Sequence, residues 1–284
     1  SKTDPRNNLR PGKTDAGVAA RNMRLVSNAP RPAGLDTTRG LTFANSDLAF
    51  GDKYVYQGNF AGFSIWDISE PARPKLVSTV QCITSQGDPS IYRNLLFISA
   101  EGMGNRNDCG NGGVKDPKDH MAGVRIFDVS NPAAPTVVGT FADYGETSSH
   151  SNWVTQVGAR RIAAHGDEQW GSHLRLVDVT EGTGGFLQQT GEWKTRDEVS
   201  AHNIMAFGSI VYVAYYQDGV RLIDIADPAH PRPVAWFNTW PGYDRGYGHS
   251  FFEGAVGIDV DLARKRIYVA DSNRDLIILA DTRP

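Results

Sequence analysis

The sequence predicts an all-β fold, a five-bladed β-propeller, and a repeated phrase is the first observation behind this prediction. The phrase is a β-rich strand that ends in Asp, and its full form continues into Pro-x-x-Pro. It occurs in full at residues 63–74, 124–135 and 220–231, and in shorter form at 174–180 and 276–282. Successive copies of its Asp lie 46 to 61 residues apart, the length of a four-stranded blade with variable loops. Thirty glycines and fifteen prolines against four methionines indicate short strands joined by tight turns.

Each unit is expected to contain four strands, of which the repeated phrase supplies the third. A second β-rich stretch precedes every phrase, at residues 53–56, 95–99, 161–164, 210–214 and 266–270. A shorter inner strand lies before most of these, as at 47–52 and 203–209. Outer strands follow at 75–80, 136–141, 186–191 and 233–237. Pattern and spacing together predict five units of one architecture.

The aspartates that end the repeated strands are expected to be structural. A carboxylate at this position can cap the turn that follows, and the Pro-x-x-Pro segment then stops ladder pairing before the next strand. These aspartates are Asp67, Asp128, Asp178, Asp224 and Asp281.

The fifth unit lacks an outer strand because the chain ends at Pro284. Residues 22–30 resemble the outer-strand phrase of the first unit, since Arg24-Leu-Val-Ser matches Lys75-Leu-Val-Ser. We therefore expect this N-terminal outer strand to close the ring and remove two exposed sheet edges. The predicted organisation is a polar leader at 1–21 and a single propeller domain at 22–284.

The phrase at 223–231, Ile-Asp-Ile-Ala-Asp-Pro-Ala-His-Pro, resembles the LVIVD-repeat family of bacterial β-propellers, as does Val-Tyr-Val-Ala at 211–214. The resemblance spans roughly residues 22 to 282, and three of the five units match it well. The segment from Gly40 to Phe60 looks like the opening of a lipoprotein-like or periplasmic branch. The resemblance implies secretion or cell-surface display more than any particular reaction.

Composition excludes several classes of function. The net charge of −3 offers no basic reserve for binding nucleic acid. No apolar run approaches the roughly 20 residues that a membrane-spanning helix requires. The sequence also contains no Gly-x-Ser-x-Gly elbow, phosphate-binding glycine loop or Cys-x-x-Cys.

Cys82 and Cys109 are the only cysteines, and both lie in polar, glycine-containing sequence. Free thiols favour apolar packing, so this setting predicts a disulfide, which persists only in an oxidising compartment. The protein is accordingly expected to be secreted, periplasmic or at the cell surface, with a signal segment removed. Two unrelated cysteines in a cytosolic protein are the alternative.

The inner strands of a propeller line its channel, so residues at their starts converge. Three histidines precede inner strands, and with Asp88 they form a candidate site for a divalent transition metal or calcium: His150, His202 and His249. Asp47 and Glu253 are further possible oxygen ligands. The alternative is a polar ring that binds channel water. If the site is catalytic, the candidates are His150, His202, His249 and Glu253.

A second set of candidates is predicted to bind ligand at the channel mouth. Alignment of the blades places Asn45, Asp88, Asn152 and His202 at one level. The long loop at 238–254 adds Trp240, Tyr243, Arg245 and Tyr247, which suit stacking on a sugar or an aromatic ligand. A hydrophobic plug over the last blade is the alternative for this loop. The long excursion at 101–123, which carries Cys109, is the other candidate contact surface.

Two functions remain open at this point. The first is a binding module that takes a small-molecule, glycan or protein ligand through its channel face. The alternative is a metal-assisted lyase, isomerase or hydrolase that uses the channel histidines, since a fold alone does not select a reaction.

Overall fold

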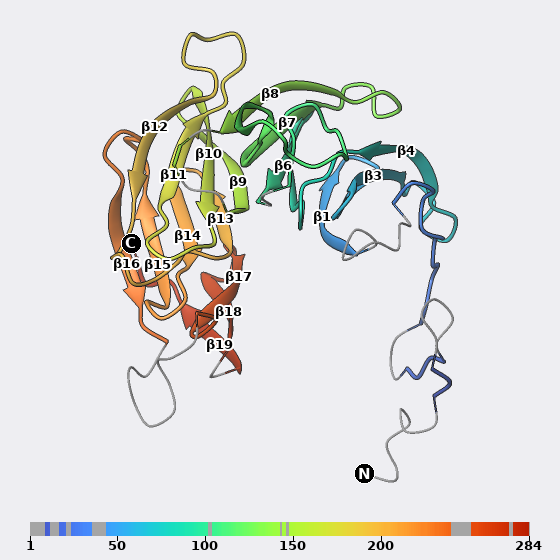
Figure 1. Ribbon diagram of the computed structural model, residues 1–284. Helices are drawn as coiled ribbons and strands as arrows, with labels where there is room; N and C mark the ends of the chain where they lie inside the picture. Colours follow the sequence, from blue (N-terminus) through green and yellow to red (C-terminus); the bar gives the residue numbers. More distant parts are fainter. Residues whose placement is uncertain are drawn as a thin grey trace.

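Five antiparallel sheets form the blades of the propeller in this computed structural model (Figure 1). The structure describes residues 9–11, 17–20, 24–35, 44–101, 104–142, 144–145, 148–239, 251–272 and 275–283. Blade 1 contains β1 (Asn45–Gly51), β2 (Tyr54–Asn59), β3 (Gly62–Asp67) and β4 (Lys75–Gln81). Blade 2 contains β5 (Pro89–Tyr92), β6 (Leu95–Ala100), β7 (Gly123–Asp128) and β8 (Thr136–Ala142).

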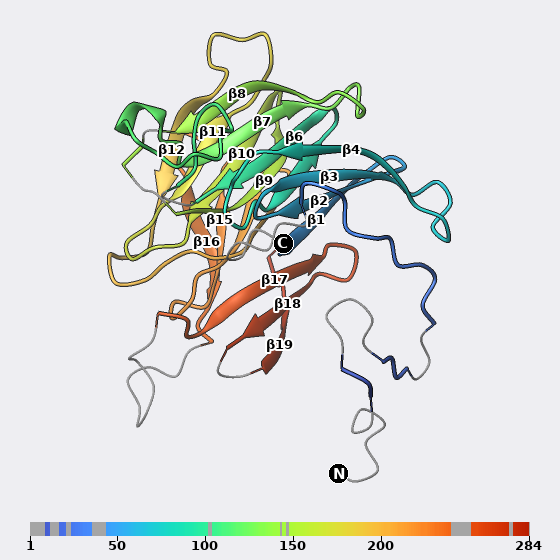
Figure 2. The same ribbon diagram turned by 45° about the vertical axis from the view of Figure 1, so that its right-hand side comes forward.

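The remaining blades follow in chain order. Blade 3 contains β9 (Ser149–Val157), β10 (Arg160–Asp167), β11 (Leu174–Asp178) and β12 (Gln188–Trp193). Blade 4 contains β13 (Ile204–Phe207), β14 (Ile210–Ala214), β15 (Val220–Asp224) and β16 (Arg232–Phe237). Blade 5 contains β17 (Ala255–Asp261), β18 (Arg266–Asp271) and β19 (Asp275–Ala280), visible as a separate three-stranded sheet in Figure 2. The predicted five-bladed architecture is confirmed.

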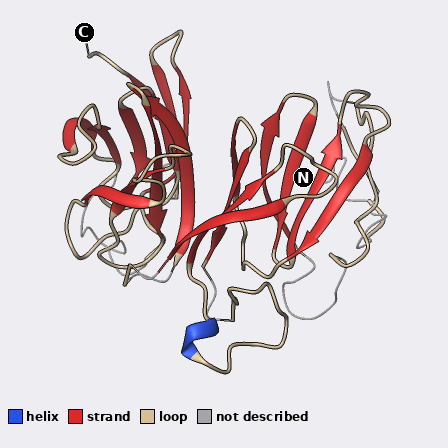
Figure 3. Cartoon of the chain, turned by 90° about the horizontal axis from the view of Figure 1, so that it is seen from above, coloured by secondary structure: helices blue, strands red, loops and turns tan. Residues whose placement is uncertain are grey.

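A single 3₁₀ turn, η1 (Pro117–Asp119), is the helical element of the described chain and lies in the insertion of blade 2 (Figure 3). Within the described ranges no helix has the length and hydropathy of a membrane span. The first strands of successive blades contact one another in chain order, β1 with β5, β5 with β9, β9 with β13 and β13 with β17, and so follow one another around the propeller axis.

Apolar packing between neighbouring blades forms the core, and β6 shows why the sequence produces it. Successive side chains of a strand point to opposite faces. Leu96 and Ile98 pack towards blade 1, whereas Leu95 and Phe97 pack towards blade 3, and all six residues of β6 are buried. Similar clusters join blade 3 to blade 4 and blade 4 to blade 5. Among the described residues no such cluster joins blade 5 to blade 1.

Every repeat aspartate caps the turn that follows its strand, as the sequence predicts. In each case Oδ1 accepts a hydrogen bond from the backbone amide two residues later, at 2.7 to 3.1 Å: these residues are Asp67, Asp128, Asp178, Asp224 and Asp281. Four of the five also pair with a Lys or Arg side chain at 2.6 to 2.9 Å. The repeated phrase therefore encodes a turn.

The predicted closure of the ring by an N-terminal strand is not found among the described residues. Residues 24–35 form no strand and lie beside blade 1 (Figure 1), where the Ser27 hydroxyl donates to the carbonyl of Pro71 at 2.7 Å. Pro30 and Pro32 have no backbone N–H, so the segment is poorly suited to a sheet ladder. Its likeness to the outer strand of blade 1 was a misleading signal, because Leu25 and Val26 are exposed instead of packed on blade 5.

Cys82 and Cys109 form the predicted disulfide, with their Cα atoms 4.4 Å apart. The bond ties the insertion of blade 2 to the end of β4. Arg125 holds the insertion from the other side, because its fully buried guanidinium donates to the carbonyls of Arg106 and Asn107. The insertion is thus fixed by one covalent bond and by a buried cation.

We predict that Asp178→Ala lowers the free energy of unfolding at pH 7 by about 1–3 kcal/mol, since a buried charged acceptor is lost. Burial acts to raise the pKa of Asp178, but hydrogen bonds from Thr180 and the charge of Arg160 hold it below its ordinary value. A lowered pKa stabilises the fold above the unfolded value of about 4, and this contribution disappears as the pH falls further. Denaturant titration from pH 7 to pH 3 measures it.

The control for this prediction is Asp197→Ala, because the Asp197 carboxylate is 78% exposed and forms its ion pair with the neighbouring Lys194 on the surface. This control should change stability little. If the free energies of unfolding of wild type and Asp178→Ala differ by the same amount at every pH from 7 to 3, the prediction is contradicted.

We also predict that reduction loosens the insertion before it unfolds the ring. In the chain-entropy model the 27-residue separation corresponds to about 3–4 kcal/mol. The interblade clusters contain neither cysteine, so the sheets should remain. Hydrogen exchange in dithiothreitol should rise first over residues 104–122, and a Cys82→Ser/Cys109→Ser variant should not respond to the reagent. Simultaneous loss of protection in β6 and β7 would refute this order.

Candidate functional site

A cavity of about 500 Å³ lies where the five blades converge on the propeller axis. Residues from all five blades line it, which makes it the channel site that the repeat architecture predicts. The lining residues are Ser46 and Asp47 of blade 1, Gln86 and Asp88 of blade 2, His150 and Glu168 of blade 3, His202, Asn203 and Tyr216 of blade 4, and Phe252, Val256 and Ser272 of blade 5.

Breaks in strand pairing aim several of these residues into the cavity. In blade 3, Ser149 pairs with Asp167 and Ser151 with Gly166, so His150 is an extra residue in β9. Val256 is the extra residue of β17 in the same way, and β1 carries one extra residue between Asn45 and Leu48. A β-bulge turns its strand and re-aims a side chain. The cavity lining is therefore built where the regular alternation is broken.

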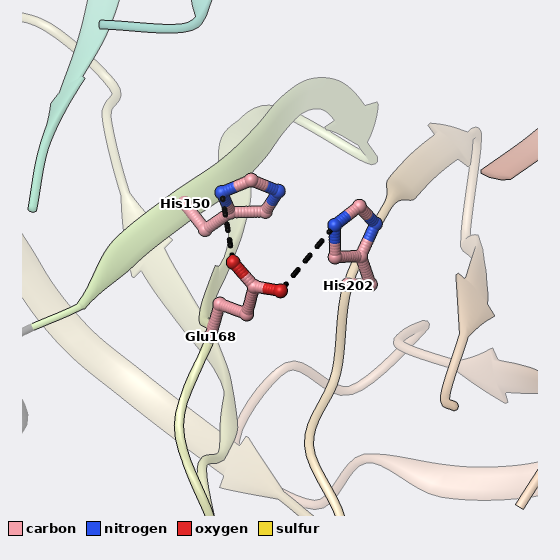
Figure 4. Close-up of side chains that lie close together, drawn as sticks. All are labelled: His150, Glu168 and His202. Atoms are coloured by element: carbon pink, nitrogen blue, oxygen red, sulfur yellow. Dashed lines mark ion pairs between the residues drawn. The ribbon is translucent and has the colours of Figure 1, made fainter. Parts of the chain in front are cut away.

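Two histidines converge on one carboxylate in this cavity (Figure 4). His150 Nδ1 lies 3.7 Å from Glu168 Oε2, and His202 Nε2 lies 3.6 Å from Glu168 Oε1. One ligand atom from each residue lies within 4.8 Å of the other two. The imidazole rings are 4.4 Å apart between centroids. The three residues come from the bulge of β9, the end of β10 and the residues just before β13.

Neighbouring groups hold this triplet in place. The Tyr216 hydroxyl donates a hydrogen bond to Glu168 Oε1. His202 Nδ1 lies 2.9 Å from the carbonyl of Val256. Because a carbonyl only accepts, this bond places the proton on Nδ1 and leaves the Nε2 lone pair directed at Glu168. His150 is buried, with 7% of its side chain exposed, and its Nδ1 makes no hydrogen bond within the described residues.

Acidic groups dominate the electrostatics of the cavity. Burial alone lowers the pKa of His150, but the carboxylates of Glu101, Asp88 and Glu168 raise it above its ordinary value. Burial and the neighbouring His150 instead lower the pKa of His202. Burial raises the pKa of Asp88 to about 7 against the opposing effect of His150. The two imidazoles thus differ in their tendency to carry a proton.

The triplet has the chemistry of a transition-metal site. Two imidazoles and one carboxylate suit zinc, manganese, iron or cobalt, and tetrahedral ligands at about 2.1 Å lie roughly 3.4 Å apart. The two separations between imidazole nitrogen and carboxylate oxygen, 3.6 and 3.7 Å, are close to that value. The carbonyl on His202 Nδ1 is the partner that usually orients a metal-binding histidine.

The structure brings four of the sequence candidates to this cavity: Asp47, Asp88, His150 and His202. Two others do not reach it. Asn152 follows the bulge of β9 and bonds with Ser90 between blades 2 and 3, and Asn45 precedes the bulge of β1 and accepts from Asn59 at 2.9 Å. The register breaks therefore separate residues that a simple alignment of blades places at one level.

The remaining candidates divide into two groups. Glu253 is buried and is not among the residues that line the cavity. Five candidates from the long loop lie outside the described residues: Trp240, Tyr243, Arg245, Tyr247 and His249.

Sequence reasoning missed Glu168 as a ligand and Tyr216 as its hydrogen-bond partner. Both follow the second strand of their blades, and Glu101, whose Oε2 lies 3.8 Å from His150 Nδ1, follows the second strand of blade 2. The sequence signal that could have predicted these residues is a polar side chain directly after the second strand of a blade. The candidates predicted from the sequence came instead from residues at the start of the inner strands and from the long loop at 238–254.

The family model described as the LVIVD repeat matches residues 45–82, 119–143 and 200–239. These spans cover blade 1, the outer half of blade 2 and blade 4, the three units with the full phrase. The chain therefore carries LVIVD repeats in three of the five blades of its propeller. No curated protein matches the LVIVD-repeat chain.

Solved structures of similar fold share little sequence with this LVIVD-repeat propeller. A protein from Lactobacillus plantarum is 12% identical with a TM-score of 0.58, and a putative 6-phosphogluconolactonase from Bacteroides fragilis is 14% identical with a TM-score of 0.60. Each alignment covers 84% of this chain and 67% of the other. The computationally designed Ika8 protein is 10% identical, with a TM-score of 0.53 over 84% of this chain and 58% of its own. At these identities the likeness concerns the fold alone.

Proposed function

We propose that the protein is a ligand-binding propeller that holds a divalent transition-metal ion with His150, Glu168 and His202. The convergence of two imidazole nitrogens on one buried carboxylate carries this proposal. Three protein ligands leave coordination positions open to the cavity, as in sites where a metal ion meets a small molecule. A small polar ligand in the channel can therefore bind both the ion and the surrounding side chains.

The proposed location is outside the cytoplasm, in a secreted or periplasmic setting. The Cys82–Cys109 disulfide supports this location, because disulfides persist in oxidising compartments and the cytosol keeps thiols reduced.

We predict that the purified protein binds Zn²⁺ or Mn²⁺ with one ion per chain, measured by calorimetric titration after chelation. Glu168→Gln keeps the size of the side chain and an oxygen for Tyr216 but removes the charge. The affinity of this variant for the metal ion should fall by more than 10- to 100-fold, the loss that is typical when a residue that only orients a metal ligand is removed. His150→Ala and His202→Ala should lose binding to a similar extent.

The matched control is His230→Ala, since the His230 side chain is 83% exposed and pairs with Asp227 in a turn. It should bind the ion as the wild type does, and melting curves should show that all variants fold. Equal affinity in wild type and Glu168→Gln would contradict the site. Absence of one-to-one binding in the wild type would favour an ion-pair cluster in which protonated His150 lies between Glu101 and Glu168.

A metal-assisted hydrolase or isomerase is the second candidate, and the position of Asp88 favours it. Its carboxyl belongs to blade 2 and lines the same cavity, but it is not one of the three proposed metal ligands. In a hydrolysis it can take the proton of the attacking water and return it to the leaving group.

For this second candidate we predict that Asp88→Asn binds the metal ion within about twofold of wild type but loses about 100-fold or more in turnover. Glucono-δ-lactone and p-nitrophenyl acetate are suitable probes, assayed with and without the ion. Turnover that is unaffected by chelation, or equal in Asp88→Asn, would leave the binding module as the function.

A further inference from the structure

A continuous row of aromatic rings leads from the metal-ligand candidate His202 to the protein surface. His202 contacts Tyr216 with ring centroids 5.2 Å apart, and Tyr216 contacts Phe251 at 5.3 Å. Phe251 in turn contacts Phe252 at 5.1 Å and Trp170 at 4.6 Å, both edge to face. The row joins residues of blades 3, 4 and 5 beside one cavity.

The outer end of this row presents aromatic surface to solvent. Trp170 is 54% exposed and Phe252 is 61% exposed, and Phe252 also lines the channel cavity. Trp170 follows Glu168 by two residues, so the same segment carries a proposed metal ligand and an exposed ring. Phe251 connects the two exposed rings, Phe252 at the cavity and Trp170 outside its lining, and exposed aromatic residues beside a polar cavity are typical of ligand-binding sites.

The cavity itself is acidic, in contrast to the aromatic surface beside it. Asp47, Asp88 and Glu168 line the cavity, and the Glu101 carboxylate lies 3.8 Å from His150 Nδ1. Carboxylates accept hydrogen bonds from hydroxyl groups and repel phosphates and carboxylates in a site of low dielectric. A metal ion held by His150, Glu168 and His202 repels cations. The two charges together favour an uncharged ligand that is rich in hydroxyl groups.

We infer that the ligand of the channel is a neutral carbohydrate. One sugar ring of an oligosaccharide stacks on Phe252, where its hydroxyl groups bind the carboxylates and the metal ion, and a further ring of the same oligosaccharide stacks on Trp170 outside the cavity. The inference rests on the proposed function, because it names the ligand class of the same cavity. It adds Trp170 and Phe252 as the residues that select this class.

The test titrates Zn²⁺-loaded protein with maltohexaose, cellohexaose and mannohexaose by calorimetry. At least one should bind, and Trp170→Ala and Phe252→Ala should each weaken that binding about tenfold while Zn²⁺ affinity stays unchanged. Trp236→Ala is the matched control, because Trp236 is 70% exposed on β16, the outer strand of blade 4, and should leave sugar binding intact.

The outcomes separate the inference from the proposed function. Zn²⁺ binding without binding of any of the three oligosaccharides would overturn the inference and leave the metal site standing. Tighter binding of tetramethylammonium or glucose 6-phosphate than of the sugars would overturn it as well, as would equal losses in Trp236→Ala and Trp170→Ala. If the wild type binds no metal ion, the same titration on metal-free protein decides the inference: binding that depends on Trp170 supports it, and no binding overturns it.

Discussion

The alternation of side chains along each strand is the constraint on which the rest of this propeller depends. The middle strand β6 uses both faces for apolar packing, with Leu96 towards blade 1 and Phe97 towards blade 3. A regular strand of this kind has no face left for the channel. Polar side chains therefore reach the axis only beside strand ends or at register breaks, which is where His150, Glu168 and His202 lie. Packing and the candidate site thus share one geometric origin.

Much of the fold was predictable because its signals are local and repeated. The Asp-terminated phrase specifies a strand, a cap and a turn within a few residues, and all five caps form as expected. Closure was not predictable in the same way. Leu25 and Val26 have the composition of an outer strand, but pairing depends on distant partners. The Ser27 bond to Pro71 holds the segment against blade 1 instead.

The site was predictable only in part, and the reason is again register. His150 and His202 were found because they stand before inner strands. Asn152 was placed with them, although one extra residue in β9 turns it towards blade 2, and nothing in the local composition announces that bulge. Glu168 was missed because its role depends on the hydrogen bond from Tyr216, more than forty residues later in the chain. Contacts between blades, more than motifs, define this site.

The central claim is that one divalent ion binds among three side chains from two blades. A crystal of the protein soaked in zinc, with diffraction measured above and below the zinc absorption edge, tests this claim most directly. The account predicts one strong anomalous peak in the channel, at about 2.0–2.2 Å from His150 Nδ1, His202 Nε2 and a Glu168 oxygen. A channel without a peak, or a peak bound only by carboxylates on the outer surface, would contradict it.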